Sequence, residues 1–365
     1  VLILDEPTAV LTPQETDELM AIMRQLAESG TSIVFITHKL REVRAVADDI
    51  TVIRRGTVVG TASPQSSESE LANKMVGRSV MMKVEKAPAS PSGGGLVFDD
   101  VSLLSPSGVP VLDHLSFGVE RGEIVAVAGV QGNGQTELAE AVLGLRTPDS
   151  GTISLEGADI TRTNPRASLD AGIGFIPEDR TTDGIIASFS IADNLVLDQF
   201  GEAPFSKGPM LKLGVIDDNA RAKQEEYDIR LTDVSDPISS LSGGNQQKVV
   251  VAREMSKELN LLVANQPTRG VDVGSVEFIH KRIVGVRDQG TPVLLISSEL
   301  DEVLSLADRV VVMYRGRIMG IVPAGTPRDV LGLMMAGVPL DEAMSASEEH
   351  SDGAGEGRTM EGGTR

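Results

Sequence analysis

A glycine-rich segment in the middle of the chain has the composition and spacing of a phosphate-binding loop. Residues 129–136, GVQGNGQT, fit the pattern G-x-x-x-x-G-K-[ST], with Gln135 at the lysine position. Its glycines let backbone N–H groups surround an anion, and the dipole of a following helix adds to the attraction. Thr136 is placed to ligate Mg²⁺, whereas Gln135 can hydrogen-bond a phosphate but adds no positive charge, so we expect weakened affinity. The alternative is a glycine-rich turn that binds nothing.

A second segment that could contact an anion lies at residues 240–248, SLSGGNQQK, before an apolar stretch typical of a helix. Ser242 is expected to be the N-cap residue of that helix. The backbone donors of Gly243 and Gly244 are then exposed to an anion. An ordinary helix cap is the alternative, but the position of this segment after the glycine-rich loop and before a Pro-Thr strand end favours a functional site.

The chain carries one set of motifs twice, at a constant offset of 260 residues (266 − 6 and 298 − 38). Residues 1–11, VLILDEPTAVL, correspond to residues 261–271, LLVANQPTRGV. The polar positions that differ are Asp5 with Asn265, Glu6 with Gln266, and His38 with Ser298. Chance does not keep register over this distance, so the sequence predicts a tandem duplication. The acidic and imidazole groups survive in one copy only.

Apolar runs alternate with amphipathic helical stretches, which predicts an α/β fold with a mainly parallel sheet. Residues 86–95, KAPASPSGGG, have the composition of a linker. The predicted organisation is a partial first unit (1–62), a helix and linker (63–95), a complete second unit (96–340) and a disordered acidic tail (341–365). Because the chain begins at Val1 inside a strand, we expect a fragment of a longer protein.

Composition excludes several classes of function. The formal net charge of −20 argues against nucleic-acid binding, which needs a basic stripe. The chain has no cysteine, which excludes disulfides and thiolate metal sites, and its 4 histidines lack metal-ligand spacing. The longest apolar runs fall short of the ~20 residues of a membrane helix, and no signal peptide is visible. We expect a protein without a transmembrane segment, cytoplasmic unless a partner holds it at a membrane.

The order of these motifs resembles the ATP-binding cassette (ABC) family, and specifically the fused double-cassette ATPases of bacterial importers for simple sugars and nucleosides. The similarity rests on the glycine-rich loop, LSGGNQQK at 241–248 and NQPTRGVDVG at 265–274, and it covers residues 1 to about 338. It implies a P-loop NTPase fold with a mainly parallel sheet core, an antiparallel β part and a helical subdomain, as a tandem repeat. Residues 1–62 are then the C-terminal part of a first cassette, and residues 96–340 are a complete, degenerate second cassette.

The resemblance also implies a role for each matched residue in the binding and hydrolysis of ATP with Mg²⁺. In the first copy, Asp5 matches the aspartate that holds Mg²⁺ through water, Glu6 the base that polarises the attacking water, and His38 the switch histidine at the γ-phosphate. In the segment GFIPEDR, Glu178 stands where most cassettes have the Q-loop glutamine. The remaining matches are an ATP-binding loop (Gly129, Gly132, Asn133, Gly134, Gln135 and the magnesium ligand Thr136), a signature (Leu241, Ser242, Gly243, Gly244 and Gln246), a D-loop (Asp272), and a degenerate Walker B and switch (Asn265, Gln266 and Ser298).

Two cassettes of this family pair head to tail, so the signature around Ser242 is expected to serve the site of Glu6 and His38. The loop at 129–136 is expected to face a signature that lies outside this sequence. The resemblance therefore implies one hydrolysing site and one mainly binding site in a two-cassette protein. We expect no appreciable ATPase activity from this chain alone, since it completes neither site.

The implied partners are membrane permease subunits, which dock near Glu178–Arg180 at the cytoplasmic face of the membrane, and indirectly an extracytoplasmic solute-binding protein. One alternative is a tandem-cassette translation factor acting on ribosomes. Such factors carry a long basic arm between the cassettes, whereas the linker here is short and the net charge is −20. Another is an inactive product of a truncated gene. The choice between sugar and nucleoside rests on resemblance alone.

Overall fold

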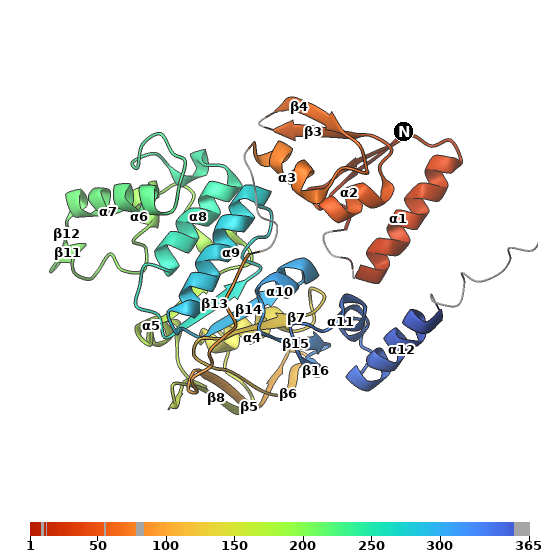
Figure 1. The fold of residues 1–365 in the computed structure, drawn as a ribbon. Coiled ribbons are helices and arrows are strands. Elements are labelled where there is room, and N and C mark those ends of the chain that lie inside the picture. The colour runs from red at the N-terminus through yellow and green to blue at the C-terminus, as the bar shows by residue number, and fades with distance from the viewer. Residues whose placement is uncertain (9–10, 12, 55, 78–83, 354–365) are drawn as a thin grey trace, which may run out of the picture.

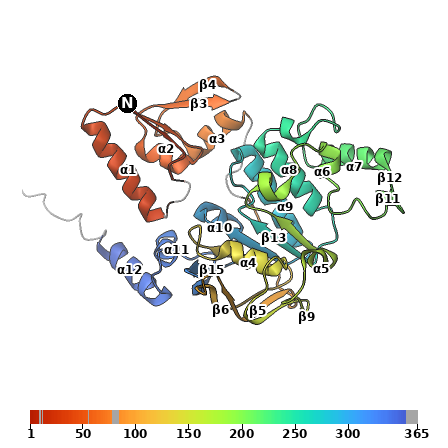
Figure 2. The same ribbon diagram turned by 180° about the vertical axis from the view of Figure 1, so that it is seen from behind.

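The computed structural model describes residues 1–8, 11, 13–54, 56–77 and 84–353 (Figures 1 and 2). Residues 1–77 are named the first unit and residues 84–353 the second unit. The elements of the first unit are β1 (Leu2–Asp5), α1 (Pro13–Glu28), β2 (Ile33–Ile36), α2 (Leu40–Val46), β3 (Ile50–Arg54), β4 (Thr57–Ala62) and α3 (Glu68–Val76). Strands β3 and β4 form an antiparallel hairpin, and Arg55 between them lies outside the described residues.

The second unit contains a longer series of elements. Its first half consists of β5 (Leu96–Leu104), β6 (Pro110–Val119), β7 (Ile124–Ala128), α4 (Gln135–Val142), β8 (Ser150–Leu155), β9 (Ala158–Asp159), α5 (Pro165–Asp170), β10 (Ile173–Ile176), the π-helix η1 (Arg180–Gly184), α6 (Ile191–Asn194), β11 (Ser206–Lys207), β12 (Met210–Leu211) and α7 (Leu213–Glu226). Its second half consists of the 3₁₀-helix η2 (Ile238–Ser240), α8 (Gly243–Glu254), β13 (Leu261–Asn265), α9 (Val273–Asp288), β14 (Val293–Ser297), α10 (Leu300–Leu306), β15 (Arg309–Tyr314), β16 (Arg317–Pro323), α11 (Arg328–Met335) and α12 (Leu340–Gly353).

A six-stranded sheet forms the centre of the second unit, in the order β10-β13-β14-β7-β15-β16. All its neighbouring strands are parallel except β15 and β16. Strands β7, β13 and β14 are buried at every residue, as expected for strands covered on both faces. One face packs on α4 and the antiparallel sheet β6-β5-β8-β9, and the other packs on α8, α9, α10 and α11.

The same strand pairing occurs in both units at the offset of 260 residues. In the first unit Leu2 pairs with Ile33, and in the second unit Leu262 pairs with Val293. The hairpins that follow have their register shift at equivalent positions, Val52/Ile53 and Val312/Met313. The duplicated sequence therefore folds into duplicated local structure.

One face of the β1–β2 sheet in the first unit is exposed. Ile3, Val34 and Ile36 are 66%, 49% and 49% exposed. Their equivalents in the second unit, at positions 263, 294 and 296, are fully buried in the core shared with α4 and the antiparallel sheet. The alternating pattern of β1 and β2 thus reflects one covered face rather than the two of β13 and β14.

The C-terminal region corrects one sequence prediction. Residues 341–353 belong to helix α12, where a disordered tail was expected from their Ser, Glu and Gly content. Leu340 packs against the hydrophobic core and Ala343 is fully buried, so two apolar positions anchor the helix beside α11. Asp341 and Glu342 lie in its first turn, where carboxylates interact favourably with the helix dipole. Residues 354–365 lie outside the described residues.

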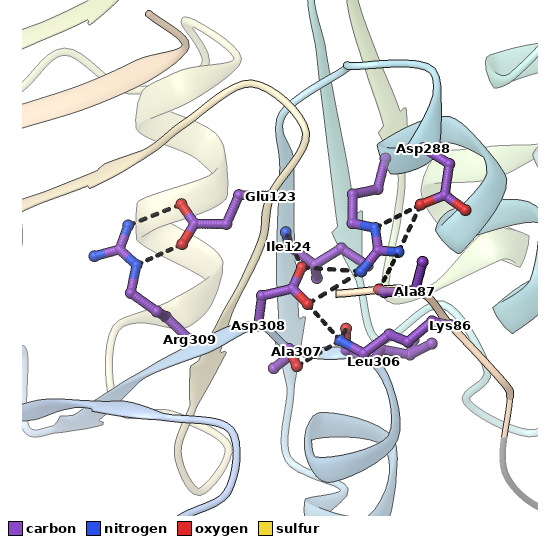
Figure 3. Close-up of polar contacts among 10 residues, drawn as sticks. Lys86, Ala87, Glu123, Ile124, Asp288, Leu306, Ala307, Asp308 and Arg309 are labelled. Atoms are coloured by element: carbon purple, nitrogen blue, oxygen red, sulfur yellow. Dashed lines mark hydrogen bonds and ion pairs between the residues drawn. The ribbon is translucent and has the colours of Figure 1, made fainter. Parts of the chain in front are cut away.

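Polar contacts fasten the linker to the second unit (Figure 3). The Lys86 ammonium donates to the backbone oxygens of Leu306 and Ala307, at 2.7 Å each, and to the Asp308 carboxylate at 2.6 Å. Arg287 donates to the backbone oxygen of Ala87 at 3.0 Å and to Asp308 at 3.1 Å. The linker builds no core, as its composition predicts, but its first residues are held at a defined place.

No helix in the part of the chain that the structure describes is long and apolar enough to cross a membrane.

Candidate functional site

Glu6 and His38 meet at the ends of the adjacent parallel strands β1 and β2. The Glu6 backbone N–H donates to the carbonyl of Ile36 at 2.9 Å, which places Glu6 directly beyond the strand pairing. Its φ of 47° is uncommon for a residue with a side chain, and such backbone strain costs about 1–3 kcal/mol. The Glu6 carboxylate accepts a hydrogen bond from Nδ1 of His38 at 2.7 Å. Both side chains are partly exposed, so the pair is open to a ligand.

The contact shifts the pKa values of both partners in opposite directions. The hydrogen bond to Glu6 raises the pKa of His38 above 6.5, and the nearby charge of Glu299 adds to this effect. The hydrogen bond from His38 lowers the pKa of Glu6 below 4.5. The ion pair therefore stabilises the folded chain between these two shifted values, and it is lost as pH rises through the raised pKa of His38 or falls through the lowered pKa of Glu6.

We expect the imidazole of His38 to titrate above pH 6.5, and Glu6→Gln to lower that midpoint because an amide cannot stabilise the imidazolium by charge. The measurement is an NMR pH titration of the histidine ring protons. His114, whose pKa is raised by its hydrogen bond to Asp100, is the internal control and keeps its midpoint in the variant. An unchanged His38 midpoint in Glu6→Gln would show that the pair does not form in solution.

The second copy has the same geometry with neutral side chains. Gln266 has a φ of 48°, and its backbone N–H donates to Ile296 at 2.7 Å. Its amide nitrogen donates to the hydroxyl of Ser298 at 3.1 Å, the counterpart of the Glu6–His38 contact. Asn265 and Gln266 are both buried. The arrangement of the pair is therefore kept in the second copy, while its charge and its proton acceptor are not.

Each copy has a buried carboxylate near its polar pair, Glu42 in the first unit and Glu302 in the second, and the sequence analysis missed both. Glu42 accepts a hydrogen bond from the Thr8 hydroxyl at 2.7 Å, and Glu302 accepts one from Thr268 at 2.6 Å. These contacts tie each Pro-Thr turn to the helix that follows the switch position. The signal was available, since Glu42 and Glu302 are also related by the offset of 260 (302 − 42).

The glycine-rich loop joins β7 to α4 and leaves open space for an anion. Gly132 has a φ of +88°, and nothing lies within 4 Å of the place where its Cβ would be. Gly134 has a φ of +105°, and a Cβ there would lie 2.5 Å from the backbone oxygen of Val111. Thr136, in the first turn of α4, is exposed. The free backbone and the adjacent hydroxyl fit a phosphate group.

Gln135 folds back into this loop. Its side-chain nitrogen donates to the backbone oxygen of Val130 at 3.0 Å, and its side-chain oxygen accepts from the backbone N–H of Asn133 at 3.1 Å. One loop donor is thus occupied by the protein itself. Asn265 offers a neutral amide oxygen where the first copy has the Asp5 carboxylate, and a neutral oxygen is a weaker ligand for Mg²⁺ than a carboxylate.

The signature segment forms the N-terminus of α8, but its serine does not cap as expected. Ser242 stands at the N-cap position, yet its hydroxyl accepts from the Asn245 side chain at 3.0 Å instead of from a backbone N–H. The side-chain hydrogen bond from Asn245 takes the place of the expected cap to a backbone N–H. Ser242 is exposed, and Gly243 lies against the guanidinium of Arg180. Gln246 donates to the backbone oxygens of Ile238 and Leu241, which holds the turn before the helix.

Two further predicted residues have clear contacts. Glu178 accepts a hydrogen bond from Gln131 in the glycine-rich loop at 2.7 Å and pairs with Arg269, so it links that loop to the segment after β13. Asp272 is the N-cap of α9 and accepts from the backbone N–H groups of Gly274 and Ser275, at 3.1 Å each.

The structure brings some of the predicted residues together and keeps others apart. A pocket between the units is lined by Gln131 and Ser298 of the second unit and by Leu11, Lys39 and Glu42 of the first. The two predicted magnesium ligands, at positions 5 and 136, belong to different units and thus to different sites. In the described parts of both units, no cluster of three or more His, Cys, Asp or Glu side chains is arranged to hold a metal ion.

Comparison with known proteins identifies the family. A family model described as ABC transporter matches residues 112–269. The chain is 47% identical over 344 residues to the nucleoside import ATP-binding protein NupA of Lactococcus lactis subsp. cremoris, covering 94% of this chain and 68% of that protein. The chain belongs to the ABC transporter family. The membership expected from the motifs is confirmed.

Two other comparisons define the extent of the ABC similarity. The glucose import ATP-binding protein TsgD13 of Haloferax volcanii is 45% identical over 341 residues, covering 92% of this chain and 62% of that protein. A crystal structure of a nucleotide-free ATP-binding cassette from an ABC transporter has a TM-score of 0.55 at 23% identity, covering 63% of this chain and 92% of that chain. The expected P-loop NTPase fold is confirmed. This ABC ATPase chain spans 62% to 68% of the length of the two curated relatives.

Proposed function

We propose that this chain is the ATP-binding and ATP-hydrolysing part of an importer for nucleosides or simple sugars. The observation that carries the proposal is the Glu6–His38 contact of 2.7 Å beside the strand end that carries Asp5. In the proposed reaction Glu6 accepts the proton of the attacking water, while His38 holds the carboxylate in place and contacts the γ-phosphate. Asp5 would hold Mg²⁺, which when bound would supply positive charge to the phosphate oxygens.

We propose that the second copy binds nucleotide without hydrolysing it. The amide of Gln266 cannot accept a proton at any pH, and Ser298 has no imidazole. The loop at residues 129–136 nevertheless keeps its open glycines, and Thr136 remains available to Mg²⁺. The exposed signature at Ser242 acts in trans, completing the hydrolytic site of Glu6. The second unit is then a required half of the catalyst rather than a decayed copy.

We expect Gln135→Lys to tighten ADP and ATP binding by roughly 10–100-fold. A charged donor to phosphate contributes about 1.5–3 kcal/mol, and the substitution also frees the Asn133 N–H that Gln135 now occupies. Isothermal titration of the full chain measures the change. Gln135→Met is the control, since it frees the same donor without adding charge. If the lysine variant binds no more tightly than the methionine variant, the loop does not hold phosphate.

The proposed partners are permease subunits that contact the surface near residues 178–180, at the cytoplasmic face of the membrane, with a solute-binding protein outside. The two relatives described above are named for nucleoside and glucose import, which supports this class of solute. The test is to express a two-cassette protein, in which this chain is joined to the phosphate-binding loop of the first copy, with its permease and to measure ATP-dependent uptake of labelled guanosine, ribose and glucose. Uptake of any of these supports the proposal. Association with ribosomes and no uptake would contradict it.

A further inference from the structure

An ion pair joins the two units at positions that the duplication makes equivalent. Nζ of Lys39 in the first unit lies 2.8 Å from the carboxylate of Glu299 in the second. The two residues are separated by the offset of 260 (299 − 39). Each is the N-cap residue of its helix, with φ and ψ of −82° and 102° at Lys39 and −84° and 104° at Glu299. The same backbone thus carries opposite charges in the two copies.

The rest of the interface repeats in the same symmetric way. Helix α3 of the first unit packs on α9 of the second, where a Cβ at Gly274 would lie 2.8 Å from Cγ1 of Val76. Helix α1 of the first unit meets α11 of the second, where a Cβ at Gly332 would lie 2.5 Å from Nε2 of Gln14. By the offset, α1 is the counterpart of α9 and α3 that of α11. The two contacts are therefore related by a pseudo-twofold axis.

A residue on such an axis meets its own counterpart. Lys39 and Glu299 occupy that place, so two first units would oppose Lys39 to Lys39, and two second units would oppose Glu299 to Glu299. Only the mixed pair brings opposite charges together. Glu42, which lies 3.9 Å from Lys39 and is buried, adds to the negative charge that the ammonium faces.

The packing beside the ion pair does not discriminate as strongly as the charges do. The counterpart of Gly332 in the first unit is Ala72, and the atoms of Gln14 nearest to Gly332 are those of its side-chain amide. Because this amide is the end of a flexible side chain, it can turn away from an added Cβ. The selectivity therefore rests on the Lys39–Glu299 charges.

We propose that the Lys39–Glu299 pair makes this surface of the second unit an interface for a first unit and rejects a second copy of either unit. The determinant lies outside the residues that bind or hydrolyse nucleotide. This determinant destabilises a pairing of two first units or of two second units. Specificity for the mixed pairing follows, because specificity is the difference in stability between the competing complexes.

The test is hydrogen–deuterium exchange of the full chain at the α3 and α9 peptides. Lys39→Glu and Glu299→Lys each place like charges at the axis, and we expect each to raise interface exchange by roughly 3–10-fold. The double swap K39E/E299K restores exchange to within about twofold of the original. A swap at the exposed Arg166–Asp170 pair of α5, which lies outside both peptides, is the control and leaves interface exchange unchanged.

Neutral variants separate the proposal from general loss of folding. Lys39→Gln and Glu299→Gln remove a charge without placing like charges at the axis, and we expect each to raise interface exchange less than the charge reversals do. Single charge reversals without effect, or a double swap that is no better than the single variants, would overturn the proposal.

Discussion

Replacing Glu6 by Gln lowers the rate of ATP hydrolysis by roughly 10²–10⁴-fold in a two-cassette protein that also carries the phosphate-binding loop of the first copy and is assembled with its permease subunits, the range expected for loss of a general base. The amide keeps the size of the side chain but cannot take a proton from water. It also removes the negative charge that holds His38, whose Nδ1 lies 2.7 Å from the carboxylate. Phosphate release measures the rate, and nucleotide affinity is measured separately to show that binding survives.

Gln266→Glu is the matched control, because it places a carboxylate at the equivalent position of the other copy. We expect it to change phosphate release by less than about threefold, since Ser298 supplies no imidazole and Gln135 no positive charge to that site. The asymmetry between the two copies would be refuted if Glu6→Gln kept full turnover, or if Gln266→Glu by itself restored turnover to the Glu6→Gln protein.

Removing the carboxylate of Asp308 destabilises the second unit by about 1–3 kcal/mol, the cost of leaving buried donors unsatisfied, since Arg287 keeps Asp288 as a charged partner. Arg287 is 1% exposed, and both it and Lys86 bind this carboxylate. The carboxylate also accepts the backbone N–H of Ile124 at 2.9 Å, at the start of the central strand β7. Chemical unfolding of Asp308→Ala, followed by circular dichroism, measures the loss.

The duplication supplies the control for this prediction as well. Asp48 is the counterpart of Asp308, but its side chain is 80% exposed and pairs with Arg24 at the surface. We expect Asp48→Ala to change the free energy of unfolding by less than about 0.5 kcal/mol. Asp308→Asn should fall between, because it keeps an acceptor for Ile124 and loses only the charge. Equal effects of the two alanine substitutions would show that the buried cluster contributes little.

The sequence was sufficient to predict a mainly parallel sheet and the equivalence of the polar positions in the two copies. Apolar runs of four or five residues, separated by helical stretches, indicate buried parallel strands. The constant offset then places Gln266 and Ser298 in the same relation as Glu6 and His38, and the contacts of 3.1 Å and 2.7 Å agree with this. Local pattern and register fix these features because each depends on a few neighbouring residues.

Contacts that depend on side-chain conformation were not predictable in the same way. The pattern of the glycine-rich loop says that Gln135 replaces a lysine, but not that its amide bonds to the loop backbone. Ser242 has the right place for a cap, yet the neighbouring Asn245 takes its oxygen. Lys39 and Glu299 lie far apart in the chain, and their pairing becomes visible only when the two units are placed together.

The anchored linker sets the distance over which the two units can separate. Lys86, which is held by Asp308, is nine positions beyond Gly77 at the end of α3 (86 − 77). A chain of that length spans at most about 30 Å. If the interface opens, the first unit stays within that radius of its partner, at an effective concentration on the order of millimolar. Reclosure is then an intramolecular event, and its rate does not depend on the protein concentration in the cell. Lys86 is the residue at which this tether is attached to the second unit.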